Sequence, residues 1–81
     1  MTSKQIGKII IFHRKKSKLT QKQLADLAGV GKTVVFDIEK GKETVQLNSL
    51  LKILSVLNIK LEMKSPIMHL MEIGNEESQS L

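Results

Sequence analysis

A very short connection between two helical segments, made by Val30 and Gly31, is the feature that most constrains the fold. Thr20 and Gln23 form a Thr-x-x-Gln capping box, which predicts that the first of these helices begins there. Gly29 is suited to end it, because glycine readily adopts the left-handed conformation that closes many helices. The next helix is then expected over about residues 32–39. So short a turn forces the two helices to pack against each other at an angle.

The same stretch resembles part of a nucleotide-binding P-loop, whose pattern is G-x-x-x-x-G-K-[ST]. Gly31, Lys32 and Thr33 match its end, but the position of the first glycine holds Asp26. A carboxylate there would repel phosphate. The chain has 81 residues, which leaves little room for βαβ units of about 30 residues each. The sequence therefore disfavours a nucleotide-binding fold.

Apolar residues at helical spacing predict two further helices, over about residues 3–17 and 47–57. Ser3 is placed to cap the first. One face of that helix would carry Ile6, Ile10 and His13, and we expect the imidazole to be packed rather than to bind a ligand. The residues expected to face the core elsewhere are Leu24, Leu27 and Ala28, then Val35 and Ile38, then Leu50, Leu51, Leu54 and Leu57. The predicted fold class is mainly α.

Beyond Asn58 the apolar period changes from that of a helix to that of a strand. Ile59, Leu61 and Met63 alternate with charged residues, which predicts a β-strand over residues 59–64. A solitary strand leaves its backbone N–H and C=O groups unpaired, so we expect antiparallel pairing with a second chain in a homodimer. An extended, solvated segment is the alternative. Residues 1–64 would form one domain and residues 65–81 an acidic, flexible tail.

Charge divides the chain in the same way. All thirteen Lys and Arg residues lie within residues 1–64 together with five of the eight acidic residues, whereas residues 65–81 hold only Glu72, Glu76 and Glu77. A basic body favours a polyanionic partner, nucleic acid first, although many Lys-rich surfaces serve only solubility. No apolar run is long enough for a membrane span or a signal peptide, so we expect a cytoplasmic protein.

Neither catalysis nor a bound metal or cofactor is indicated. The chain has no cysteine, and His13 and His69 are too far apart in sequence to suggest a zinc site. Its Ser, Thr, His and Asp residues match no nucleophile or triad motif. We therefore expect a protein that is not an enzyme and has no cofactor.

Residues 6–57 resemble the Xre/Cro-type helix-turn-helix domain of phage repressors and bacterial regulators. The matching positions are Gln21, Ala25, Gly29, Val35 and Ile38, with Leu19-Thr20-Gln21 before them and Ile38-Glu39-Lys40-Gly41 after them. The resemblance implies a phage-repressor-like fold of four to five helices. In this family the start of the third helix enters the major groove of DNA.

Carried over by position, the resemblance assigns three groups of residues. Those facing base edges would be Lys32, Thr33, Phe36 and Asp37. Those contacting phosphates would be Gln21, Lys22, Gly31, Lys40 and Lys42. Arg14 and Glu39 would form a structural ion pair between the first and third helices. Three alternatives stay open: Phe36 as a core aromatic residue, Asp37 as the partner of a nearby lysine, and each of the lysines as a solvated charge.

The segment VQLNSLLKILSVLNIKLEMKSP is similar to the end of HipB-type antitoxins, which dimerise through an intersubunit strand and bind a kinase toxin of the HipA type. This implies a repressor of its own operon that binds double-stranded DNA at an inverted repeat. A phage-type or restriction-controller repressor without a toxin is one alternative, and a protein-interaction module without DNA binding is another.

Two apolar segments exceed what one core needs. Ile9, Ile11 and Phe12 extend beyond the buried stripe of the first helix, so some of them either await a partner or pack against the tail or the other subunit. The segment 67–73 could fold on a toxin surface or on its own domain.

Overall fold

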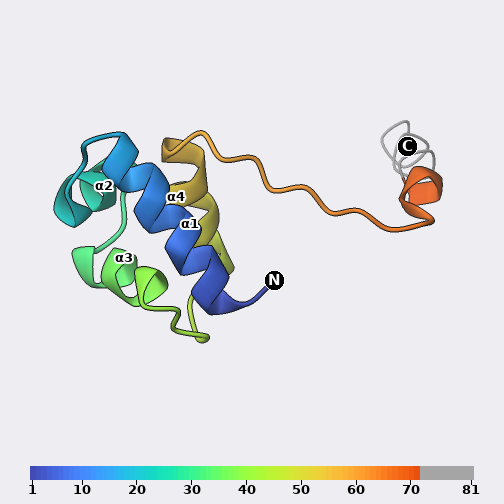
Figure 1. Ribbon diagram of the computed structural model, residues 1–81, viewed down its shortest axis with the longest axis horizontal. Helices are drawn as coiled ribbons and strands as arrows, with labels where there is room; N and C mark the ends of the chain where they lie inside the picture. The colour runs from blue at the N-terminus through green and yellow to red at the C-terminus, as the bar shows by residue number, and fades with distance from the viewer. Residues whose placement is uncertain (72–81) are drawn as a thin grey trace.

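The fold is that of a computed structural model, which describes residues 1–71 (Figure 1). Four helices follow one another: α1 (Ser3–Lys16), α2 (Gln21–Ala28), α3 (Lys32–Glu39) and α4 (Leu47–Val56). An extended segment then leads away from the helices to a helical turn that begins at Met68. The mainly α prediction is confirmed. No helix within residues 1–71 combines the length and apolar character needed to cross a lipid bilayer.

The first two helices begin with the same capping box. The Thr2 and Thr20 side chains accept hydrogen bonds from the backbone N–H groups of Gln5 and Gln23, at 3.1 and 3.0 Å. In return, each glutamine side chain accepts one from the N–H of its threonine. The expected cap at Ser3 is wrong, because Thr2 has the matching glutamine three residues later and Ser3 is already helical.

All four helices are followed by a residue with positive φ. These residues are Lys18, Gly29, Gly41 and Asn58, with φ between 58° and 84°. The residue after each donates its N–H back to a carbonyl near the end of the helix, as Leu19 does to Arg14 at 3.1 Å. This closure satisfies carbonyl groups that the helix leaves without partners. Gly29 ends α2 as predicted, whereas Lys18 and Asn58 adopt the left-handed conformation without being glycine.

One core joins the four helices. Ile10, Leu24, Val35 and Ile53, one from each helix, are fully buried.

Two expected core residues are exposed instead, Leu27 at 64% and Leu51 at 43%. Leu27 lies to one side of the face that Leu24, Ala25 and Ala28 turn inward. Leu51 is displaced in the same way, because the inward face of α4 carries Leu50, Ile53 and Leu54, and continues with the C-cap residue Leu57.

Gly7 allows α1 and α3 to approach each other closely. A Cβ atom at this position would lie 2.7 Å from the carbonyl oxygens of Ile38 and Glu39, at the C-terminal end of α3. Those carbonyls are backbone atoms and cannot move away without shifting the helix. Close contact between the two helices therefore requires the absence of a side chain at Gly7, a requirement that sequence analysis did not identify.

We predict that Gly7→Ala destabilises the fold by about 1–3 kcal/mol, because the clash outweighs the better helix propensity of alanine. Urea denaturation followed by circular dichroism measures the change. Lys8→Ala is the matched control, since Lys8 is exposed on the same helix and its replacement should change stability by less than about 0.5 kcal/mol. Equal stability of the two variants would contradict the close approach.

The segment predicted to be a strand is extended. Residues 59–65 form neither helix nor turn, and all except the half-buried Ile59 are exposed. No β-ladder occurs within residues 1–71, and the predicted ladder requires a second chain. Pairing across a homodimer and the domain boundary at residue 64 remain predictions. Residues 72–81 of the predicted tail lie outside the described part of the chain.

Candidate nucleic-acid interface

The N-terminal end of α3 is exposed and lacks a side-chain cap. Gly31 is its N-cap residue and offers no side chain to the first N–H groups, unlike Thr2 in α1 and Thr20 in α2. Gly31, Lys32 and Thr33 are all exposed. The first N–H groups of a helix have no partner within it, and they attract anions. This end of α3 is thus a place where an anionic group can bind.

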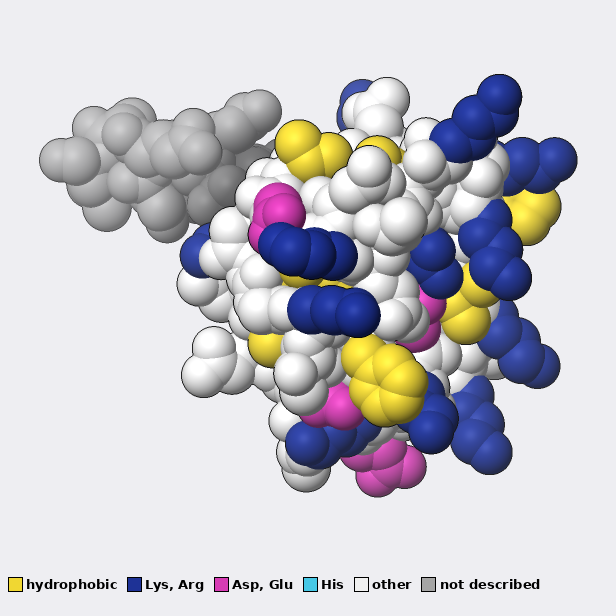
Figure 2. All heavy atoms as spheres, turned by 90° about the vertical axis from the view of Figure 1, so that its left-hand side faces the viewer, with side chains coloured by type: hydrophobic (Ala, Val, Ile, Leu, Met, Phe, Trp, Pro, Cys, Tyr) yellow, Lys and Arg dark blue, Asp and Glu magenta, His cyan; other side chains and the backbone are white. Residues whose placement is uncertain are grey.

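The face of the molecule that carries α2 and α3 is rich in basic side chains. Figure 2 looks onto this face and shows Lys and Arg side chains standing out from much of it, with acidic side chains interspersed. Lys22 on α2, Lys32 on α3, and Lys40 and Lys42 just after α3 are all exposed. The four predicted lysine contacts therefore come from α2, α3 and the turn that ends α3.

Phe36 and Asp37 lie one turn further along α3. Phe36 is 43% exposed, so it is not a core aromatic residue, and Lys40 Nζ lies 4.9 Å from the centre of its ring. Asp37 is half-buried and its carboxylate accepts a hydrogen bond from Lys42 Nζ at 3.4 Å. The structure thus leaves the Phe36 ring accessible, while Asp37 has the lysine partner considered as its alternative.

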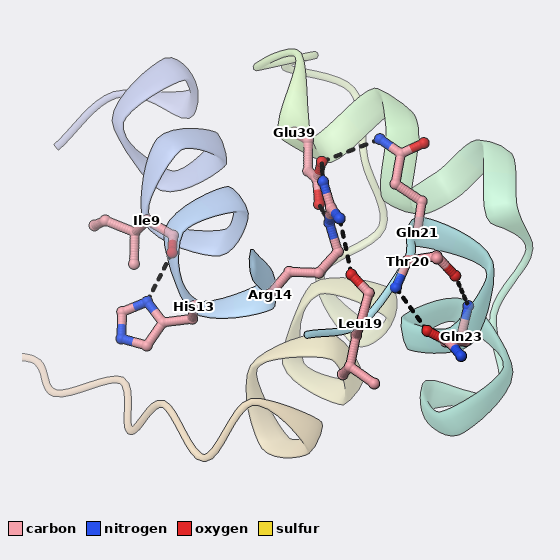
Figure 3. A network of polar contacts seen from close by, with 8 residues as sticks. All are labelled: Ile9, His13, Arg14, Leu19, Thr20, Gln21, Gln23 and Glu39. Carbon is pink, nitrogen blue, oxygen red and sulfur yellow. Dashed lines mark hydrogen bonds and ion pairs between the residues drawn. The ribbon is translucent and has the colours of Figure 1, made fainter. Parts of the chain in front are cut away.

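A buried carboxylate at the other end of α3 connects three helices (Figure 3). Glu39 accepts hydrogen bonds from Arg14 Nε at 2.6 Å and Nη2 at 3.0 Å, and from Gln21 Nε2 at 3.0 Å. Arg14 also donates to the carbonyl oxygen of Leu19 at 2.9 Å. We call Arg14, Leu19, Gln21 and Glu39 the Glu39 network. It ties α3 to α1 and to the start of α2, and so fixes the direction in which α3 presents its N-terminal end.

Gln21 has a role in the fold as well as its predicted role at phosphate. Its amide nitrogen is bonded to Glu39, which sequence analysis did not anticipate. That nitrogen carries two hydrogens, so one stays available for a phosphate oxygen. A glutamine at the first position of α2 that takes no part in the capping box is the sequence signal that could have suggested a contact outside its own helix.

The side chains of Glu39 and Arg14 are 4% and 12% exposed, so removing one partner leaves a buried charge. We predict that Glu39→Ala lowers the free energy of unfolding by about 3 kcal/mol. Asp26→Ala is the control, because it breaks the exposed ion pair with Lys22 and should cost less than about 0.5 kcal/mol. Chemical denaturation measures both changes, and a cost for Glu39→Ala no larger than the control would refute the network's stabilising role.

The two histidines take no part in this surface. His13 is half-buried, and its Nδ1 lies 2.7 Å from the carbonyl oxygen of Ile9, as for a packed imidazole. Within residues 1–71 no three His, Asp or Glu side chains gather in the way that metal ligands would.

Comparison with known proteins places this architecture in a family. Residues 12–63 match the family model described as Helix-turn-helix. Over 65 residues, the chain is 35% identical to the uncharacterized HTH-type transcriptional regulator y4mF of Sinorhizobium fredii (strain NBRC 101917 / NGR234), covering 80% of this chain and 86% of the relative. The protein therefore belongs to the Xre-type helix-turn-helix family of transcriptional regulators.

Solved structures share the fold at low sequence identity. A chain of the HipA-HipB-O2-O3 complex aligns with a TM-score of 0.74 and 20% identity, over 82% of this chain and 93% of that chain. A complex of a HipB variant with an O2 20mer aligns with a TM-score of 0.73 and 20% identity, over 82% and 92%. A chain described as MDT Protein aligns equally well, with a TM-score of 0.73. The helical arrangement of this chain is thus that of HipB.

Proposed function

We propose that this protein is a sequence-specific, double-stranded DNA-binding repressor that acts as a homodimer in the cytoplasm. The observation that carries the proposal is the uncapped N-terminal end of α3, exposed on a basic face and fixed by the Glu39 network. In helix-turn-helix proteins, this end of the second helix of the motif contacts bases in the major groove. The family membership supports the same role.

Base recognition falls to the exposed side chains of α3. Lys32 donates hydrogen bonds to guanine O6 and N7, and Thr33 contacts a thymine methyl group. Phe36, whose ring is accessible, packs on another thymine methyl. Asp37 accepts a hydrogen bond from cytosine N4. To do so, its carboxylate must release the 3.4 Å contact with Lys42 Nζ.

Phosphate contacts come from both sides of the groove. Gln21 and Lys22, at the start of α2, reach one strand, and the Gly31 N–H group contributes at the start of α3. Lys40 and Lys42, after α3, add charge at the opposite end. Because these contacts release counterions from DNA, binding weakens as the salt concentration rises.

We predict that Lys32→Ala and Thr33→Ala each weaken operator binding by about 1–3 kcal/mol and relax sequence preference. Fluorescence anisotropy on the inverted repeat next to the gene, at fixed salt, measures the loss. Lys52→Ala is the control, since Lys52 is an exposed lysine on α4, and it should leave affinity nearly unchanged. Unchanged affinity in both α3 variants would exclude groove entry by α3.

The homodimer is proposed to form through the extended segment 59–64. Exposed Leu61 and Met63 alternate with charged residues, and antiparallel pairing about a two-fold axis would satisfy the backbone groups of both segments. A dimer of this kind places two α3 helices on successive major grooves, about 34–36 Å apart or a multiple of this. The two-fold axis of such a dimer explains why an inverted repeat is the expected operator.

We predict that Leu61→Pro/Glu62→Pro weakens dimerisation by at least about tenfold, because consecutive residues of a strand direct their N–H groups to opposite sides, so one of the two prolines removes a donor from the ladder. Sedimentation equilibrium measures the dissociation constant. Lys60→Ala, which keeps its N–H group, is the control and should dimerise normally. A wild-type chain that stays monomeric at micromolar concentration, or a double-proline variant that dimerises as tightly, would disprove the shared strand.

We further propose that the repressor is the antitoxin of a HipA-type kinase and controls its own operon. The likeness in fold to HipB supports this role, because HipB has been solved in the HipA-HipB-O2-O3 complex and in a complex with the O2 20mer. Coexpression with a HipA-type kinase encoded beside the gene should restore growth that the kinase alone arrests. If growth stays arrested although both proteins accumulate, the antitoxin role would be excluded, and the protein would be a repressor without a toxin partner.

A further inference from the structure

The outer face of α1 is an exposed stripe that neither the core nor the proposed DNA surface uses. Gln5, Ile9, Phe12 and Lys16 follow one another at intervals of three or four residues, so they lie along one side of the helix. Ile9 is 37% exposed and Phe12 57%. This side of α1 is opposite Gly7, whose contact with α3 faces the DNA-binding half of the molecule. The stripe is therefore free to bind something else.

The chemistry of the stripe specifies its partner. A shallow groove of about 480 Å³ lies between Met1, Gln5, Lys8 and Ile9. Further along, Lys16 Nζ lies 5.7 Å from the centre of the Phe12 ring. The helix contains no Asp or Glu. A fitting partner must therefore offer apolar side chains together with negative charge.

The C-terminal segment of the chain has this complementary character. Ile67, just before the turn that begins at Met68, and Leu70 and Met71 within it are exposed and spaced by three and four residues, so they lie on one side. The sequence continues with Glu72, Glu76 and Glu77, and residues 65–81 contain no Lys or Arg. Figure 1 shows the described part of this segment well away from the helices of its own chain.

Pairing through residues 59–64 would direct the segment toward the other subunit. In an antiparallel pair about a two-fold axis, the C-terminal end of one segment lies beside the N-terminal end of the other. Because residue 59 lies just after the end of α4, residues from 65 onward would then run past the end of the other subunit's α4 toward its helices. We propose that the outer face of α1 is the docking site for residues 67–77 of the second chain, an inference that rests on the proposed homodimer.

Charge distinguishes this face from the exposed apolar surface around Leu27 and Leu51. Leu27 on α2 and Leu51 on α4 are also exposed, but Asp26 and a single lysine, Lys52, lie beside them in sequence. On α1, Lys8, Lys15 and Lys16 flank the apolar residues. An acidic segment is attracted to α1 and has less reason to choose the surface around Leu27, which therefore provides a matched control.

Disulfide trapping tests the proposal directly, because the chain has no native cysteine. Full-length chains carrying Gln5→Cys and Met71→Cys are coexpressed with different tags, and crosslinked heterodimer is quantified in a glutathione buffer. The control pairs Leu27→Cys with Met71→Cys. We expect at least about tenfold more crosslink with Gln5→Cys, because docking raises the local concentration of the thiol.

Charge reversal tests the electrostatic part of the docking. Adding Lys8→Glu/Lys16→Glu to the Gln5→Cys chain should abolish the excess crosslink, and Lys8→Arg/Lys16→Arg should retain it.

The outcomes separate this inference from the proposed function. Sedimentation of the same samples reports whether they are dimers, and operator binding is measured in parallel. Dimers that bind DNA but crosslink no better through Gln5→Cys than through Leu27→Cys would overturn the docking alone. Monomers would overturn both the docking and the shared strand. A crosslink that forms only within one chain, in a Gln5→Cys/Met71→Cys variant, would overturn the assignment to the second subunit.

Discussion

The carboxylate of Glu39 is the group on which the arrangement of the helices depends. It is almost completely buried and accepts hydrogen bonds from α1, through Arg14, and from α2, through Gln21. Buried ion pairs add little net stability compared with apolar packing, but separating the partners leaves an uncompensated buried charge. The benefit here is orientation: α3 is held at its C-terminal end by charge, so its N-terminal end points outward at a fixed angle.

The close contact at Gly7 complements this polar network. The carbonyl oxygens that exclude a side chain from Gly7 belong to Ile38 and Glu39, in the last turn of α3. Backbone approach and the buried carboxylate therefore act on the same few residues. This concentration leaves the opposite end of α3 without interactions that would compete with a ligand.

Sequence predicted the parts of the fold that are determined locally. A capping box spans four residues and a closing glycine one, so Thr20, Gln23 and Gly29 could be interpreted without knowing what packs around them. The family resemblance then supplied the Arg14–Glu39 pair. Positions that depend on tertiary approach were missed. Nothing in the sequence distinguishes Gly7 from an ordinary helical glycine, and periodicity could not tell whether Leu51 or Ile53 faces the core of an apolar helix.

The candidate interface was predictable to a similar extent. The helix-turn-helix spacing located Lys32 and Thr33 on an exposed helix end, and the structure agrees on their exposure. The sequence could not show that the Gln21 amide already donates a hydrogen bond to Glu39, or that Asp37 is already paired with Lys42. Both contacts depend on how α3 and the turn after it are placed.

The missing cap of α3 has a consequence for motion. Eight residues, including the β-branched Thr33, Val34, Val35 and Ile38, form a helix with little stability of its own. Its first turn should therefore open more often than those of α1 and α2, and its amide hydrogens should exchange faster with solvent. An anion at Gly31 would supply the missing acceptor, so DNA would slow exchange most at the turn that reads it.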